Sequence, residues 1–175
     1  MKVLMTTRAM CVLCALISLP VLAVEVTFRP VVDGVYAYIG ETDGRTYENE
    51  GLNANIGLVV TPEGAVLIDS GATFQSAHKI QEAVKKVTSQ PVRWVINTGG
   101  QDHRWLGNGY FRAQGAEIMA HASAESDMKA RAGGHLETLK VLKERLDGTI
   151  PTLPNRFVQG NDTRMALGGV MIELK

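Results

Sequence analysis

The sequence predicts an α/β protein in which helices pack on a mixed β-sheet. Residues 24–69 contain only strand and turn patterns, whereas strand-like and helix-like segments alternate from residue 70 onwards. A strand meander followed by such alternation is typical of a mixed sheet with packed helices. Apolar residues make up 45% of the 175 residues, so the chain can form the core of one domain, or of part of a larger one.

Residues 1–23 are expected to be a secretory signal peptide. Lys2 and Arg8 form a basic start, and a short apolar run then leads to a cleavage site after Ala23. The run is too short to span a bilayer comfortably, so we expect it to be removed rather than retained as an anchor. The mature chain, residues 24–175, would then be secreted into the periplasm with no stable membrane span.

Cleavage would change the chemistry available to the mature chain. Both cysteines, Cys11 and Cys14, would leave with the signal, which excludes disulfides and cysteine-based metal sites. The whole chain has 18 basic and 18 acidic residues, and removal of the two basic residues of the signal leaves a net charge of about −2. This balance gives no basic face for nucleic acid, so a small-molecule substrate or a protein partner is expected instead.

The first part of the mature chain predicts a strand meander. Pro62 and Gly64 suit a tight turn and make the last two strands a hairpin. Residues 41–51 are polar and form a loop long enough to reach over a site. Four strands are expected: residues 24–28, 34–40, 53–60 and 65–69.

A helix is expected at residues 74–87. Thr73 can cap it and Pro91 lies just beyond it. The next apolar run, residues 92–96, is expected to be a strand that ends in a polar loop. Five apolar residues spaced three or four apart define the buried face of the helix: Phe74, Ala77, Ile80, Val84 and Val87.

The remaining chain predicts further alternation of helices and strands. A break in the long helical stretch is expected at Gly133 and Gly134. Because the last apolar strand ends at the end of the sequence, we expect part of its sheet to lie outside this chain. The expected elements are a short helix at 107–114, a strand at 116–120, a helical stretch at 122–147, and strands at 156–158 and 170–174, with a turn near 160–162 or 168–169.

One ordered set of motifs carries a family resemblance. An apolar strand ends in Asp69-Ser70-Gly71, and after the helix Val95-Ile96-Asn97-Thr98 leads into Asp102-His103 and then Leu106-Gly107-Asn108. This set resembles the metallo-β-lactamase superfamily, and within it the periplasmic, quinoprotein-associated zinc hydrolase-like branch. The resemblance, from Val26 to Lys175, implies the first half of an αββα sandwich. It also implies zinc-dependent hydrolysis of an ester, thioester or amide.

The metal motif departs from that family. The family signature after Asn-Thr is His-x-His-x-Asp-His, whereas this chain has Gly99-Gly100-Gln101-Asp102-His103 and is one residue shorter. By resemblance only Asp102 and His103 are metal ligands, and Asp69 corresponds to the buried acidic residue behind the site. Catalytic zinc needs about three protein ligands and an open position for water. Two ligands predict weak zinc binding, or none.

The residues alone leave three interpretations of Asp102 and His103 open. They are the remaining half of a metal site, or ordinary loop residues that bond to backbone amides and solvent, or an acid–base pair with Ser70 or Thr98 as a neighbour. No residue is assigned a catalytic role. By resemblance the chain is an exported hydrolase-like protein with impaired or no catalysis, and the alternative is a non-catalytic, truncated or degenerate relative that acts as a binding or accessory protein.

Overall fold

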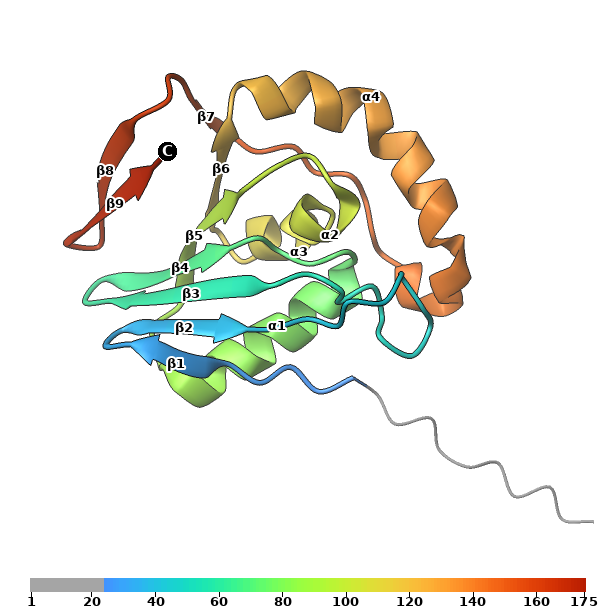
Figure 1. Cartoon of the computed structure of the whole chain (residues 1–175), viewed down its shortest axis with the longest axis horizontal. Coiled ribbons are helices and arrows are strands. Elements are labelled where there is room, and N and C mark those ends of the chain that lie inside the picture. The colour runs from blue at the N-terminus through green and yellow to red at the C-terminus, as the bar shows by residue number, and fades with distance from the viewer. Residues whose placement is uncertain (1–23) are drawn as a thin grey trace, which may run out of the picture.

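A seven-stranded mixed sheet with helices packed on it forms the centre of the computed structural model, which describes residues 24–175 (Figure 1). The expected α/β class is confirmed. The expected signal peptide, with Cys11 and Cys14, lies outside the described residues. Among residues 24–175, no helix combines the length and apolar character that crossing a bilayer requires.

The first four strands form the antiparallel half of the sheet. The hairpin is confirmed, with Thr61 paired to Gly64 at its turn. The strand expected at residues 24–28 is wrong, because Val26 and Phe28 are buried in the core without joining the ladder. Alternation there indicated burial of one face rather than strand pairing. The observed strands are β1 (Arg29–Val32), β2 (Val35–Tyr38), β3 (Ile56–Thr61) and β4 (Gly64–Ile68).

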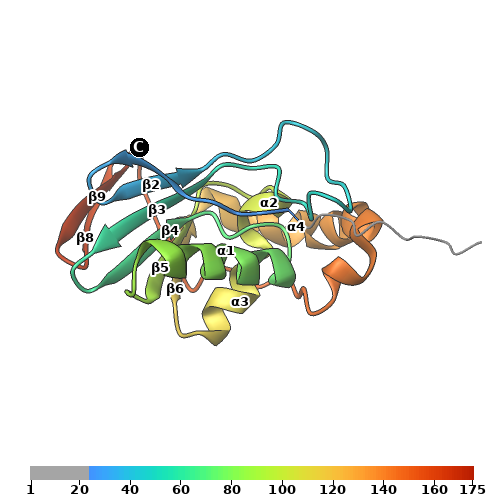
Figure 2. The same cartoon turned by 90° about the horizontal axis from the view of Figure 1, so that it is seen from below.

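Helix α1 (Phe74–Val87) follows β4 as expected. The side chain of Thr73 accepts a hydrogen bond from the backbone N–H of Ser76 at 2.9 Å, which satisfies one of the free amides of the first turn. The buried face of α1 packs with the apolar residues of the sheet in the main core. Figure 2 shows α1 and α3 on the same face of the sheet.

The second half of the sheet is parallel. Strands β4 to β7 run in one direction and end at one edge. The segment around Asp102, expected to be a loop, is instead a single helical turn, α2 (Asp102–Trp105). The other elements are β5 (Val92–Asn97), α3 (Asn108–Ala113), β6 (Glu117–His121) and β7 (Arg156–Val158).

The long helical stretch does not break where its glycines predict. Helix α4 (Ser123–Thr138) runs through Gly133 and Gly134, and the helix type changes only at η1 (Leu139–Leu146). The backbone leaves helical geometry in a kink at Lys143, whose φ is 54°. Burial of side chains such as Leu139 at the end of the stretch outweighs the lower helix propensity of the two glycines.

A two-stranded hairpin, β8 (Thr163–Leu167) and β9 (Val170–Leu174), pairs only with itself. The sequence predicted β9 and, as one of two places, the turn at residues 168–169, but it did not predict β8. Met165 and Leu167 of β8 pack in one cluster with Ile96 and other residues of the large sheet. The hairpin therefore covers a second apolar face of the molecule.

Candidate functional site

The candidate site lies where β4 and β5 end side by side. The two strands pair in parallel, with Ile68 opposite Ile96, so the residues that follow them meet at one edge of the sheet. In open α/β sheets the carboxyl ends of the strands are where ligands usually bind. Asp69 and Thr98 therefore lie next to each other, although they are far apart in the sequence.

Asp69 is buried behind this edge and orders the segment after β5. Its carboxylate accepts hydrogen bonds from the backbone N–H and from the hydroxyl of Thr98, both at 2.7 Å. Its φ of 65° is in the left-handed region, which Asp adopts more readily than most residues. Burial raises the pKa of Asp69 to about 6, although the Thr98 hydrogen bonds and the charge of Arg104 oppose the rise.

A buried network of uncharged side chains holds the next layer together. The hydroxyl of Ser70 donates to Oδ1 of Asn108 at 2.9 Å, and Asn97 and Asn108 exchange hydrogen bonds at 2.8 and 3.0 Å. Asn97 also donates to the backbone oxygen of Arg104 at 2.7 Å. Ser70 is fully buried and its hydroxyl proton is engaged, so it is not available as a nucleophile. The sequence motif contained both asparagines without indicating this role.

Asp102 and His103 are the first two residues of α2, and the guanidinium of Arg45 contacts both side chains. Nη2 of Arg45 donates to Oδ1 of Asp102 and lies 2.9 Å from Nδ1 of His103. The backbone N–H of His103 donates to the same Asp102 oxygen at 2.8 Å. The structure brings these two predicted residues together with an arginine that sequence reasoning missed. The only signal was the expectation that residues 41–51 reach over a site.

The charges at this cluster follow from the same contacts. Burial opposes ionisation of Asp102, but the hydrogen bonds from Arg45 and His103 outweigh it and hold the pKa of Asp102 below its ordinary value. Burial also lowers the pKa of His103, and although Asp102 opposes this, Arg45 and Arg104 strengthen it. At neutral pH the cluster therefore contains an ionised Asp102, a neutral His103 and a charged Arg45.

The residues present do not fit a catalytic zinc ion. The acceptor oxygen of Asp102 is already bonded to Arg45 and to a backbone amide, and Gly99 and Gly100 carry no ligand atoms. A Cβ atom on Gly100 would lie 2.2 Å from Oδ2 of Asp127, so that side chain fills the space beside the loop. Within residues 24–175, no three His, Cys, Asp or Glu side chains are grouped as a metal site requires.

The two other histidines close to the strand ends do not complete a site. Nδ1 of His121, at the end of β6, is 2.6 Å from the hydroxyl of Ser123. The ring of His135 packs edge-on against Trp105, with their centroids 6.4 Å apart. Burial lowers the pKa of His135, so it is neutral at pH 7. Neither ring lies against the Arg45 guanidinium in the way that His103 does.

A cavity of about 540 Å³ opens beside the cluster. The residues that line it include the polar Thr98, His103 and Arg104 and isoleucines such as Ile56 and Ile68. Thr98 is not a free nucleophile, because its hydroxyl donates to Asp69 and accepts from Nη1 of Arg104 at 2.9 Å. The cavity can hold a small molecule with polar and apolar parts, but among the residues that line it none is an activated nucleophile.

Comparison with known proteins identifies the fold. Residues 49–173 match the family model described as the metallo-beta-lactamase superfamily. The chain is similar to a metallo-β-lactamase from Pontibacter korlensis (TM-score 0.59, 20% identity) and to one from Hirschia baltica (0.58, 16%). It is also similar to the mono-zinc form of FIM-1 from Pseudomonas aeruginosa (0.52, 23%). No curated protein matches the chain.

These similarities are partial in length. In the order given, they cover 85%, 84% and 63% of this chain but only 59%, 59% and 48% of those proteins. The chain therefore spans about half to three fifths of the length of the solved structures that it matches. At these identities the similarity establishes the fold, and function must be argued from the site.

Proposed function

The chain belongs to the metallo-β-lactamase superfamily, and we propose that it acts as a small-molecule binding protein rather than as a zinc-dependent hydrolase. One observation carries the proposal. The carboxylate of Asp102, which by resemblance would bind metal, is bonded to the guanidinium of Arg45. Arginine remains protonated in proteins, so at this position it competes with a metal ion and cannot itself activate water as a Lewis acid.

The cavity beside Asp69 supports a binding role. It offers hydrogen-bonding groups from Thr98, His103 and Arg104 next to apolar side chains such as Ile56 and Ile68. Ligand sites commonly combine a mostly apolar surface with a few fixed polar groups. A protein partner, in the manner of an accessory protein, is the second kind of ligand that the proposal allows.

We also propose where the protein acts. The basic and apolar character of residues 1–23 supports export. The order of the motifs that contain Asp69 and Thr98, which resembles the quinoprotein-associated branch, supports the same location. On this proposal the mature chain is a periplasmic member of that branch that has lost the first metal site.

The alternative function is zinc-dependent hydrolysis of an ester, thioester or amide. One observation favours it. The side chains of Asp102 and His103 lie close together, and His103 lines the cavity. On this alternative a third ligand, not recognised among the described residues, completes the site.

Zinc binding to the purified chain from Val24 to Lys175 distinguishes the two functions. We expect elemental analysis to find no stoichiometric zinc, calorimetry to find no sub-micromolar affinity, and ester, thioester and β-lactam substrates to be hydrolysed at the background rate. The His103→Ala variant is the matched control and should behave in the same way. Stoichiometric, tight zinc that His103→Ala abolishes would refute the binding-protein proposal in favour of the hydrolase.

A further inference from the structure

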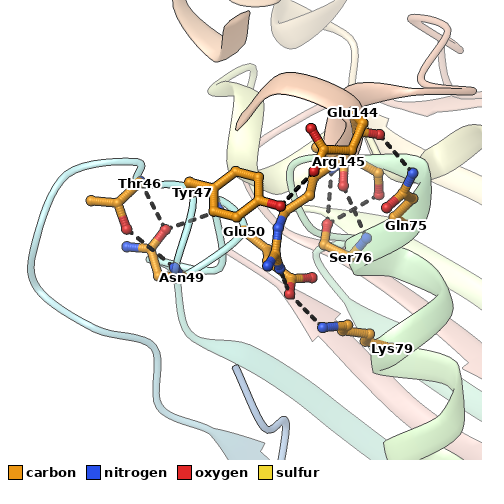
Figure 3. A network of polar contacts seen from close by, with 11 residues as sticks. Thr46, Tyr47, Asn49, Glu50, Gln75, Ser76, Lys79, Glu144 and Arg145 are labelled. Carbon is orange, nitrogen blue, oxygen red and sulfur yellow. Dashed lines mark hydrogen bonds and ion pairs between the residues drawn. The ribbon is translucent and has the colours of Figure 1, made fainter. Parts of the chain in front are cut away.

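The connection between β2 and β3, residues 39–55, is fixed to the body of the protein at a buried carboxylate (Figure 3). Glu50 is 2% exposed, and one of its oxygens accepts a hydrogen bond from Nζ of Lys79 on α1 and forms an ion pair with Nη1 of Arg145 on η1. A buried carboxylate is tolerated only when cations and hydrogen bonds replace its water. Glu50 therefore ties this β2–β3 loop to two separate helices.

Other contacts stiffen the same part of the β2–β3 loop. The hydroxyl of Tyr47 donates to Glu144 at 2.5 Å, and the guanidinium of Arg145 lies 4.1 Å from the centre of the Tyr47 ring. Figure 3 shows Tyr47 and Glu50 of this loop lying against Arg145. Oδ1 of Asn49 accepts from the backbone N–H of Thr46 at 3.0 Å and closes the turn on itself. The position of the preceding residue, Arg45, is thus defined by an anchored turn.

Arg45 uses that position to reach the acceptors that a metal ion would use. Its Nη2 bonds to Oδ1 of Asp102 and lies 2.9 Å from Nδ1 of His103. Asp102 is 3% exposed, so its charge requires a partner inside the protein. In metal sites a divalent cation supplies this partner. Here a guanidinium supplies it from within the chain.

We propose that Arg45 is a built-in cation that takes the place of a metal ion at Asp102 and His103, and that Glu50 anchors the loop that presents it. This inference rests on the proposed loss of zinc chemistry and supplies its physical cause. The site keeps the buried Asp102 carboxylate because the β2–β3 loop neutralises it. The loop in turn remains over the strand ends because two contacts hold it there. One is the bond between Arg45 and Asp102, and the other is the pairing of Glu50 with α1 and η1.

A double-mutant cycle on urea unfolding tests the proposal in the full mature chain. Arg45→Met should raise the unfolding equilibrium constant at least tenfold, because it leaves Asp102 charged and buried without a partner. In the Asp102→Asn background the same Arg45→Met change should raise it less than threefold. If the single Arg45→Met variant does not fold, the double variant must still fold. The proposal would be overturned if Arg45→Met changed the unfolding equilibrium constant equally in both backgrounds, or if the double variant did not fold.

An exposed pair provides the matched control. Arg164 and Glu173 form an ion pair on the β8–β9 hairpin with side chains 71% and 35% exposed. The cycle of Arg164→Met and Glu173→Gln should give near-additive effects, since exposed pairs contribute little. Repeating the Arg45 cycle in a Glu50→Gln background should reduce the Arg45–Asp102 coupling at least threefold, and an unchanged coupling would overturn the anchoring role of Glu50.

The zinc measurement and the double-mutant cycle together show which of the two proposals is wrong. Tight zinc in the wild-type chain together with strong Arg45–Asp102 coupling would contradict both the binding-protein proposal and the replacement of a metal ion by Arg45, and would leave Arg45–Asp102 only as a stabilising ion pair. Additive effects at Arg45 and Asp102 in a chain that binds no zinc would contradict the built-in cation alone.

Discussion

Asp69 shows how one residue can combine a structural role with an electrostatic cost. Its carboxylate fixes the backbone and hydroxyl of Thr98, and through them the start of the segment that leads to α2. Its backbone adopts a left-handed conformation that Asn also tolerates well. Replacement by Asn therefore removes the charge and retains both the shape of the side chain and the conformation of the turn.

At the residue scale we predict a pH dependence that Asp69→Asn removes. The pKa of Asp69 is raised from 3.8 to about 6, so in this window the unfolded chain loses the proton while the folded protein retains it. The contribution of Asp69 to the free energy of unfolding therefore falls as pH rises from about 4 to about 6. The shift corresponds to ~3 kcal/mol. Urea unfolding of both proteins across this range should show their stability difference changing by about that amount.

The Asp69→Asn comparison isolates this carboxyl group from Asp102 and His103, which both proteins contain. Because the pKa values of Asp102 and His103 are lowered, their contributions to stability decline as the pH falls. The contribution of Asp69 declines as the pH rises. Stability curves for the two proteins that stay parallel between pH 4 and pH 7 would show that Asp69 ionises normally in the folded state.

At the element scale, α4 tolerates glycines because its packing is concentrated elsewhere. Met128 near its middle and Leu139 at its end are fully buried, whereas an added Cβ at Gly133 or Gly134 would meet nothing within 4 Å. The two glycines therefore lower helix propensity without serving a close contact. This is why the helix continues where the local sequence predicts a break.

We predict that Gly133→Ala and Gly134→Ala each stabilise the protein by about 0.5–1 kcal/mol, because alanine restricts the unfolded chain and favours the helix. Thermal and urea unfolding would measure the gain. Gly107→Ala is the contrasting control. A Cβ there would lie 2.1 Å from the backbone oxygen of Ser70, so this variant should be destabilised. A loss of stability for either α4 variant would mean that its glycine makes an unrecognised contact.

At the scale of the whole molecule, the large sheet and the β8–β9 hairpin differ in the contacts that stabilise them. Strands β4 and β5 each have a hydrogen-bonded neighbour on both sides, whereas β8 and β9 pair only with each other. The hairpin is attached to the large sheet mainly through side chains such as Met165 and Leu167. Its backbone hydrogen bonds can therefore open without breaking the ladder of the large sheet.

We predict from this arrangement that native-state hydrogen exchange separates the two sheets. Amides of β5 should exchange only through global unfolding, whereas those of β8 and β9 should exchange through local opening, with protection lower by roughly tenfold or more. Leu167→Ala should lower hairpin protection further, with a smaller effect on β5. Equal opening free energies in β5 and the hairpin, both lowered together by Leu167→Ala, would show that the two sheets unfold as one unit.

Local sequence patterns were sufficient for most elements. The β3–β4 hairpin, the Thr73-capped α1 and the strand β5 all follow from periodicity and turn residues, and the structure confirms them. Where the sequence prediction was wrong, a non-local effect is responsible. Apolar and polar residues alternate in residues 24–28 because one side of this segment is buried. The strand that pairs with β2 is nevertheless β1, which begins at Arg29. Such pairing depends on register across the sheet, which composition does not encode.

For the site, the sequence by itself determined which reactive groups are present and which are missing. Asp69, Asp102 and His103 were identified from the order of motifs, and Gly99 to Gln101 already excluded the usual zinc ligands. Tertiary structure alone decided what surrounds them. Arg45 lies 57 positions from Asp102 in the chain, and the two partners of Glu50, Lys79 on α1 and Arg145 on η1, lie 29 and 95 positions from it. Such contacts form because burial makes an unpaired charge costly, and burial is a property of the folded chain.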